Sequence, residues 1–271
     1  MGMWGRLFGN IAGGAAPRAG DATLESVIAF ERIEVHYQPL IQPRSGRVAG
    51  AEALARSAIE PNADALFARA ARAGLAERLS GLVQRKALFA AAAWQGPMKG
   101  LSVSLNLLPS EIAREGFERS FSEAMELAGI DPARVIVEIT ENALLVADAG
   151  VAAQLSRLRR QGVRIAIDDF GTGYASLAYL TSLPLDMIKI DRGLITQIAG
   201  RNRDRIVVKA MIRLARELDL KVVVEGVEDE AQLALLADWG CDLYQGFLGA
   251  AALSEDELLR FVAAGRMPRV A

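Results

Sequence analysis

The segments Val135-Ile-Val-Glu-Ile-Thr140 and Arg164-Ile-Ala-Ile-Asp-Asp169 decide the fold, because each is a short β-branched run that carries acidic residues at its end. Residues 151–161, which have helical periodicity, lie between them. The order strand, helix, strand is typical of parallel strands joined by a crossover helix. The two segments therefore predict a parallel sheet that carries its polar side chains at the carboxyl ends of the strands.

The same alternation extends in both directions along the chain. We expect eight strands, at residues 33–40, 49–55, 101–107, 135–140, 164–169, 187–191, 221–225 and 243–246. Helical patterns lie between many of them, at residues 76–95, 117–128, 151–161, 204–218 and 228–239. This order predicts an α/β chain that folds as a modified (β/α)8 TIM barrel. The first two strands are joined directly near Pro43-Arg-Ser-Gly46, so we expect a hairpin and an antiparallel first barrel strand.

Composition limits the class of protein. The 271 residues are 52% hydrophobic and 24% charged, as in folded globular proteins. Residues 1–22 include a stretch rich in Gly, Ala and Pro, so we expect a flexible lead-in there and one barrel domain over residues 23–271. No apolar run is long enough for a transmembrane segment. The formal charge of −2 argues against duplex nucleic acid as a partner, whereas a small anion can bind where metal ions reverse the local field.

The chain has one cysteine, Cys241, and one histidine, His36. An intrachain disulfide and a Cys/His zinc cluster are therefore excluded, and we expect a cytoplasmic location, where thiols stay reduced. His36 lies inside a predicted strand and is interpreted as a strand histidine rather than a catalytic base. If the chain is an enzyme, its reagents are carboxylates, lysines, amides and metal ions.

Six predicted strands end in an ionisable or amide side chain: Glu52, Glu138, Asp168 with Asp169, Lys189, Glu225 and Gln245. Active sites of such barrels lie at the carboxyl ends of the strands, so we expect these groups to converge there. Any one of them is equally well explained as a salt-bridged rim group, but several converging carboxylates repel one another unless cations neutralise them. Oxygen ligands without His or Cys favour Mg²⁺ or Mn²⁺, and adjacent aspartates suit a two-ion site that binds a phosphoryl group.

A series of motifs occurs in order along the chain: Tyr37-Gln-Pro39, Gly50-Ala-Glu-Ala-Leu54, Glu138-Ile-Thr-Glu141, Asp168-Asp-Phe-Gly-Thr-Gly-Tyr174, Lys189-Ile-Asp191, Glu225-Gly-Val-Glu228 and Gln245-Gly246. This series resembles the EAL-domain cyclic di-GMP phosphodiesterase family over about residues 30–260. The resemblance implies a modified TIM barrel that hydrolyses cyclic di-GMP to linear pGpG with Mg²⁺ or Mn²⁺ in bacterial second-messenger signalling. It also implies a homodimer, and any input signal would come from a signalling partner protein or from expression.

The resemblance further implies a role for individual residues. The implied metal ligands are all carboxylates: Glu52, Glu138, Asp168, Asp169 and Glu225. Lys189 resembles the residue that orients or deprotonates the attacking water, and Glu52 and Gln245 complete the implied catalytic group. Arg56 and Gln38 resemble substrate contacts. Glu141 resembles a glutamate that holds the loop from Phe170 to Gly173 in its working shape and couples it to the dimer interface.

One departure from the family pattern lies in Leu101-Ser-Val-Ser-Leu-Asn106, where we place the position of the family's asparagine ligand at Ser104. Asn106 lies two residues later on the same strand face, about 7 Å nearer the mouth, and is expected to reach a metal ion from there. Because a serine hydroxyl is a weaker ligand, a second function stays open: a degenerate domain that serves as a non-catalytic cyclic di-GMP receptor or a protein-binding regulator. A different barrel enzyme, such as an Mg²⁺ enoliser or a Schiff-base aldolase using Lys189, is a third hypothesis, and it does not explain Asp168 and Asp169 together with Arg56.

Overall fold

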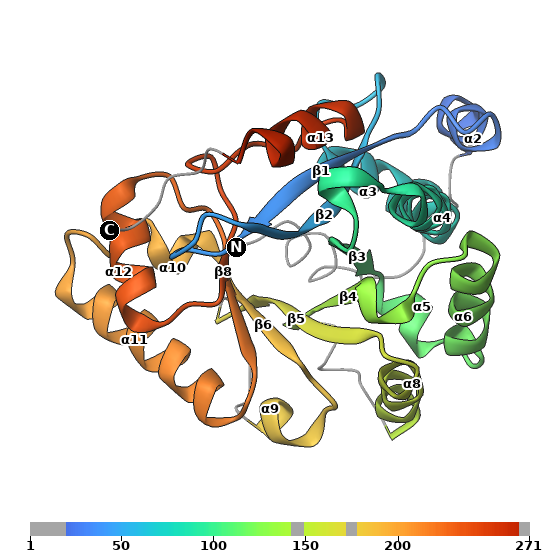
Figure 1. Cartoon of the computed structure of the whole chain (residues 1–271). Coiled ribbons are helices and arrows are strands. Elements are labelled where there is room, and N and C mark those ends of the chain that lie inside the picture. The colour runs from blue at the N-terminus through green and yellow to red at the C-terminus, as the bar shows by residue number, and fades with distance from the viewer. Residues whose placement is uncertain (1–19, 142–148, 172–177, 266–271) are drawn as a thin grey trace.

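The strands of the computed structural model form a closed barrel. The structure describes residues 20–141, 149–171 and 178–265. In these residues eight strands lie side by side in sequence order: β1 Glu34–Ile41, β2 Val48–Arg56, β3 Ser102–Leu107, β4 Val135–Thr140, β5 Arg164–Phe170, β6 Met187–Ile190, β7 Lys221–Val224 and β8 Leu243–Tyr244 (Figure 1). The predicted α/β barrel and its eight strands are confirmed.

The strand β1 runs opposite to the others. It pairs antiparallel with both β2 and β8, whereas every other pair in the barrel is parallel. A tight turn makes this inversion possible, because the Gln42 amide donates to the Arg47 carbonyl and Gly46 has a positive φ of 68°. The expected hairpin and antiparallel first strand are confirmed. The register sets Gln38 directly opposite Glu52.

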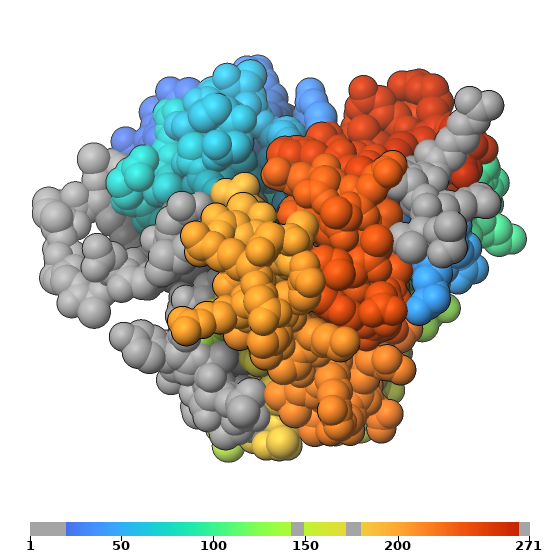
Figure 2. Space-filling model, turned by 90° about the vertical axis from the view of Figure 1, so that its left-hand side faces the viewer, coloured from blue at the N-terminus to red at the C-terminus, as the bar shows by residue number. Residues whose placement is uncertain are grey.

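Helices surround the barrel (Figure 1). The described helices are α2 Ala22–Ala29, α3 Ala63–Ala73, α4 Ala76–Ala93, α5 Pro109–Ala113, α6 Phe117–Ala128, α8 Ala149–Arg160, α9 Ala178–Ser182, α10 Arg192–Ile195, α11 Asn202–Glu217, α12 Glu230–Trp239 and α13 Glu255–Ala264. The five expected helices correspond to α4, α6, α8, α11 and α12. Helices α10, α11 and α12 cover the middle of the face that Figure 2 shows. No helix in the described ranges has the length and apolar character needed to cross a membrane.

The expected lead-in of residues 1–22 lies, apart from its last three residues, outside the described residues. The Asp21 carboxylate accepts a hydrogen bond from the Leu24 amide and caps α2, which begins at Ala22. The ordered fold therefore includes the end of the segment that we assigned to the lead-in.

An apolar layer fills the interior of the barrel near the amino-terminal ends of the parallel strands: Leu40, Ile136, Ala166, Met187, Val223 and Leu243. On each parallel strand of this set, the residue two positions later is polar, because side chains two apart share a strand face. Those residues are Glu138, Asp168, Lys189, Glu225 and Gln245. On the inverted β1 the offset is reversed, and Gln38 precedes Leu40 by two. Strand periodicity therefore places a polar layer directly above the apolar one.

A glycine on β2 tests how tightly the barrel is closed. A Cβ atom added at Gly50 would lie 2.7 Å from the Ser102 carbonyl oxygen of β3. We expect Gly50→Ala to lower the free energy of unfolding by about 1–3 kcal/mol, because this backbone contact cannot relax without moving a strand. The measurement is urea unfolding of the full chain.

Gly81 in the interior of α4 provides the matched control. A Cβ atom there meets nothing within 4 Å. Gly81→Ala should raise stability by about 0.5–1 kcal/mol, since alanine loses less conformational entropy on entering a helix. Equal effects of the two substitutions would contradict the close approach of β2 and β3.

Candidate functional site

Lys189 lies at the centre of the polar layer. Its Nζ atom is 2.7 Å from Glu225 Oε1, 2.8 Å from Glu138 Oε2, 3.2 Å from Asp168 Oδ1 and 3.3 Å from Glu52 Oε2. These carboxylates come from β2, β4, β5 and the residue after β7. The side chain of Lys189 is 1% exposed. One buried ammonium therefore holds together four carboxylates that are far apart in the sequence.

The four carboxylates of this cluster outnumber its one ammonium group, and this imbalance shifts several of their pKa values. Burial raises the pKa of Glu138 to about 8, and the negative charges of Glu52 and Asp168 add to that effect. Burial likewise raises the pKa of Asp168, although the Lys189 ammonium opposes it. For Lys189, burial disfavours the cation, but the surrounding carboxylates outweigh it and raise its pKa well above the usual value. The layer therefore has more negative charge than one lysine compensates.

Glu52 is the exception among the carboxylates. Burial works to raise its pKa, but the Lys189 ammonium and hydrogen bonds from Gln245 and Asn106 together hold it below the usual value. Gln245 Nε2 donates to Glu52 Oε2 at 2.8 Å, and Asn106 Nδ2 donates to Glu52 Oε1 at 2.8 Å. Glu52 is therefore the carboxylate that the site keeps ionised most firmly.

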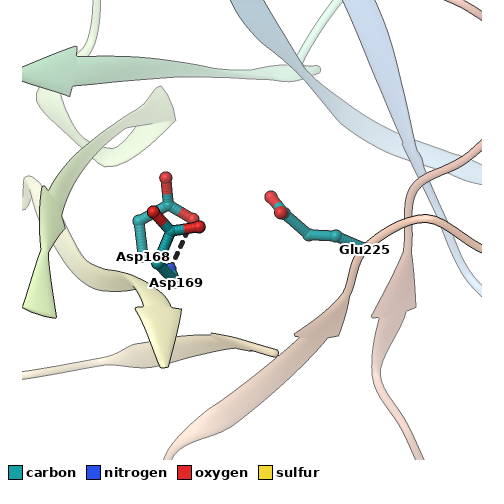
Figure 3. Close-up of side chains that lie close together, drawn as sticks. All are labelled: Asp168, Asp169 and Glu225. Atoms are coloured by element: carbon teal, nitrogen blue, oxygen red, sulfur yellow. Dashed lines mark hydrogen bonds between the residues drawn. The ribbon is translucent and has the colours of Figure 1, made fainter. Parts of the chain in front are cut away.

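A second carboxylate group lies beside the lysine cluster. Oxygens of Asp168, Asp169 and Glu225 lie within 4.8 Å of one another, and Figure 3 shows their side chains converging from β5 and from the end of β7. Asp169 reaches this position because its backbone has a positive φ of 57°, and its amide donates to Asp168 Oδ1 at 2.9 Å. The two consecutive aspartates therefore turn toward the same space.

These residues fit divalent cations. All their donor atoms are oxygens, which suits Mg²⁺ or Mn²⁺ better than zinc or copper. The surplus of negative charge around Lys189 would be relieved by further cations. The buried oxygen Oε1 of Gln245 also has no hydrogen-bond partner among the described residues, so it is available to a ligand. The predicted ligands Glu52, Glu138, Asp168, Asp169 and Glu225 thus lie together in one layer.

The structure changes the interpretation of Ser104. The side-chain amide of Asn106 donates a hydrogen bond to Glu52. Ser104, two residues earlier on β3, is fully buried, and its hydroxyl donates to Glu138 Oε1. The pairing with β4 sets Asn106 opposite Glu138 and Ser104 opposite Ile136, whereas the pairing with β2 sets Ser104 opposite Glu52. The Ser104 hydroxyl is therefore engaged with Glu138, and the side-chain amide that β3 directs at the carboxylates belongs to Asn106. The role of Asn106 as a metal ligand stays a prediction.

The two predicted polar contacts Gln245 and Gln38 form a chain. Gln245 Nε2 donates to Gln38 Oε1 at 2.8 Å as well as to Glu52. Gln38 Nε2 in turn donates to the Ala250 carbonyl at 3.1 Å. The amide of Gln38 is thereby anchored to the segment after β8, and its position follows from the inversion of β1.

An open cavity of about 500 Å³ lies above the carboxylates. Arg56 and Gln38 line it, as expected for substrate contacts. Sequence reasoning missed four further residues of the wall that could meet a ligand: Leu54, Arg192, Glu228 and Phe247. Phe247 is 70% exposed and lines the cavity, so its ring is available to an apolar or aromatic part of a ligand. Its signal in the sequence was its place two residues after Gln245.

Glu141 makes one contact with the loop that it is predicted to hold. Its Oε2 accepts a hydrogen bond from the Gly171 amide at 3.0 Å. Gly171 has a φ of 95°, and a Cβ there would lie 2.8 Å from a methyl group of Leu194. Glu141 thus holds the start of the segment that follows Asp169. Thr172 and Gly173 of the predicted loop lie outside the described residues, and its coupling to a dimer interface stays a prediction.

Comparison with known proteins agrees with the resemblance that the sequence motifs indicate. The family model described as "EAL domain" matches residues 22–252. The protein described as "Cyclic di-GMP phosphodiesterase NbdA" of Pseudomonas aeruginosa is 36% identical over 250 residues, which is 90% of this chain and 32% of NbdA. The chain spans about a third of the length of the curated relatives it matches.

Solved structures show the same relationship. The MucR phosphodiesterase of Pseudomonas aeruginosa in complex with c-di-GMP is 33% identical with a TM-score of 0.81, covering 87% of this chain and 97% of that one. BlrP1 of Klebsiella pneumoniae, in complex with manganese and cy-diGMP, is 30% identical with a TM-score of 0.74, covering 82% of this chain and 56% of that one.

Ser104 provides a test of this arrangement. We expect Ser104→Asn to weaken Mn²⁺ binding by about tenfold, because the larger amide has no room at a fully buried position and the hydrogen bond to Glu138 is lost. Ser104→Ala, which removes only the hydroxyl, should cause a smaller loss of the same sign. Calorimetric titration with Mn²⁺ measures both. Tighter binding by Ser104→Asn would restore the view that Ser104 stands in for a ligand.

Proposed function

Because the chain belongs to the EAL domain family, we propose that it is a metal-dependent phosphodiesterase that hydrolyses cyclic di-GMP to linear pGpG in bacterial second-messenger signalling. The observation that carries this proposal is the cluster of Lys189 and five carboxylates, four of which line the cavity: Glu52, Asp168, Asp169 and Glu225. A ligand-binding module needs a cavity but has no need for so costly a concentration of buried charge. The activity printed for NbdA and the ligand bound to MucR support the same reaction.

The residues that would hold Mg²⁺ or Mn²⁺, in the two-ion site that we propose, are Glu52, Asn106, Glu138, Asp168, Asp169 and Glu225. When bound, the ions supply positive charge that offsets the charge of the phosphate and lowers the pKa of the attacking water. Asp168 and Glu225 belong both to the lysine cluster and to the group with Asp169, so the two groups form one continuous set of residues that would hold the ions.

The chain's own residues divide the remaining tasks. Lys189 carries three N–H donors among the carboxylates and orients the attacking water while stabilising negative charge on the phosphate. Gln245 fixes Glu52 through its amide and leaves its buried oxygen free for the water. Arg56 lies on the same face of β2 as Glu52 and about 13 Å farther along the strand, where its guanidinium meets a substrate phosphate oxygen. Gln38, on the neighbouring strand β1, contacts the ligand from beside Glu52.

Two other hypotheses lose support. A Schiff-base aldolase needs a neutral amine, and the four carboxylates around Lys189 stabilise its ammonium form instead. The non-catalytic receptor or regulator rested on Ser104, but the Ser104 hydroxyl bonds Glu138 while Asn106 brings an amide to Glu52, which supports the phosphodiesterase instead. The phosphodiesterase remains the function that the site supports best.

We further propose that the chain acts as a homodimer in the cytoplasm. Ile206 and Val207 on α11 are 59% and 48% exposed, and such a pair is suited to an interface. Cys241 is a free, buried thiol, which agrees with a reducing compartment. Light scattering of the purified chain tests the dimer.

Substitution of the central lysine tests the proposed reaction. We expect Lys189→Met to lower the rate of pGpG formation by about 100-fold or more, because the stem is kept and the cation is lost. Binding of cyclic di-GMP in the presence of Mn²⁺ should change by less than about threefold. Chromatographic separation of pGpG from cyclic di-GMP measures turnover, and calorimetry measures binding.

Lys221→Met is the matched control for this substitution. Lys221 begins β7 at the opposite end of the barrel and is exposed, so its replacement should leave the rate unchanged. If Lys189→Met turns over as fast as the parent chain, Lys189 has no part in the reaction. If the parent chain binds cyclic di-GMP but forms no pGpG with either Mg²⁺ or Mn²⁺, the chain is a receptor and the proposed function is wrong.

A further inference from the structure

A buried polar group lies behind β3, outside the cavity and outside every motif of the sequence. It consists of Ser80 and Gln84 on α4 and Glu111 on α5, which are 2%, 8% and 4% exposed. The Ser80 hydroxyl donates to Glu111 Oε2 at 2.9 Å, and Gln84 Nε2 lies 2.8 Å from Ser80 Oγ and 3.3 Å from both oxygens of Glu111. Three polar side chains on two helices thus form one hydrogen-bonded unit.

This unit contacts the backbone on both sides of Leu107. Gln84 Nε2 is 3.3 Å from the Asn106 carbonyl oxygen, and Glu111 Oε2 accepts a hydrogen bond from the Leu108 amide at 2.8 Å. Every group facing Gln84 Nε2 is an acceptor, so the amide nitrogen is fixed as the donor. The end of β3 is therefore held from outside the barrel.

The barrel supports the end of β3 on one side only, where β3 pairs with β4 as far as Leu107 with Ile139. The pairing of β2 with β3 runs from Gly50 with Ser102 to Glu52 with Ser104 and stops there. A cavity of about 20 Å³ is lined there by residues of β2, β3, α3 and α4, among them Leu54, Asn106 and Gln84. Gln84 bonds the carbonyl of Asn106 at the place where the neighbouring strand has ceased to pair.

Asn106 is the residue whose side chain meets the carboxylate layer, through its hydrogen bond to Glu52. We propose that Ser80, Gln84 and Glu111 are positioning residues that set the height and direction of Asn106, and through it the affinity of the site for a divalent cation. This inference rests on the proposed function, because it gives Asn106 the role of a metal ligand. Residues that orient a ligand from behind typically change metal affinity by about 10- to 100-fold when they are lost.

The test is Gln84→Met in the full chain, since methionine keeps the length of the side chain and removes the donor. We expect Mn²⁺ to bind about tenfold more weakly, as measured by electron paramagnetic resonance of the free ion. The side-chain amide resonances of Asn106 should also move in the metal-free protein. Glu111→Gln, which is closer to the parent in shape, should shift both readouts in the same direction by a smaller factor, and it serves where Gln84→Met lowers the yield of folded protein.

Gln154→Met is the matched control. Gln154 is also a buried glutamine, 5% exposed, and its Nε2 donates to the Ile112 carbonyl at the other end of α5 without reaching β3. It should cost stability but leave Mn²⁺ affinity and the Asn106 resonances unchanged. An equal loss of affinity in Gln84→Met and Gln154→Met would mean general loosening and would overturn the proposal.

The remaining outcomes separate this proposal from the proposed function. If Mn²⁺ affinity and the Asn106 resonances both stay at their parent values in Gln84→Met and in Glu111→Gln, the positioning role is wrong, whatever the activity of the parent chain. If the parent chain binds Mn²⁺ but hydrolyses no cyclic di-GMP, the proposed function fails while a loss of affinity in Gln84→Met still supports the positioning role. If the parent chain binds no Mn²⁺, the inference fails together with the metal site.

Discussion

The contact of Lys189 with four carboxylates is the interaction on which the centre of the molecule depends. Each charge removed from water into the barrel interior costs several kcal/mol, and only close opposite charges and hydrogen bonds offset that cost. Lys189 is 1% exposed and meets Glu52, Glu138, Asp168 and Glu225 within 3.3 Å, so no single carboxylate is left without a cation. Four separate strand ends are thereby tied to one nitrogen. The cluster is stable enough to form and negative enough to bind further cations.

The apolar layer beneath this cluster decides where the charges can lie. Ile136, Ala166, Met187 and Val223 close the interior, so the polar side chains two residues later can point only into the space above them. The inverted strand β1 obeys the same rule in reverse, with Leu40 in the apolar layer and Gln38 in the polar one. A shift of any strand by one residue would move its polar side chain out of the layer and an outward-facing side chain in. The register of the barrel strands therefore determines which side chains form the site.

Sequence reasoning predicted the parts of this arrangement that depend on local periodicity. The eight strands, the hairpin at Gly46 and the polar residue that each strand carries follow from residues close together in the chain, and the convergence of the carboxylates then follows from the barrel fold. The role of Ser104 did not, because a strand's own alternation says which residues share a face but not how high each lies against its neighbours. Only the side-chain contacts reveal it, because Ser104 bonds Glu138 and Asn106 bonds Glu52. Helices α3 and α13 were not predicted although Asn62 and Ser254 cap them, because their sequences are marked by these capping residues more than by apolar runs.

In this site the neutral amides of Gln245 and Asn106 fix the orientation of Glu52, which the charge of Lys189 cannot do. Coulombic attraction around Lys189 falls off slowly with distance and sets no direction, so it gathers the carboxylates without fixing their orientation. Gln245 and Asn106 donate to the two different oxygens of Glu52 and hold that carboxylate from both sides. An amide keeps this orientation whichever cation lies nearby, because its own charge never changes. The direction of Glu52 is therefore set by hydrogen bonds that lead outward, through Gln245 to Gln38 and through Asn106 to Gln84, to the walls of the barrel.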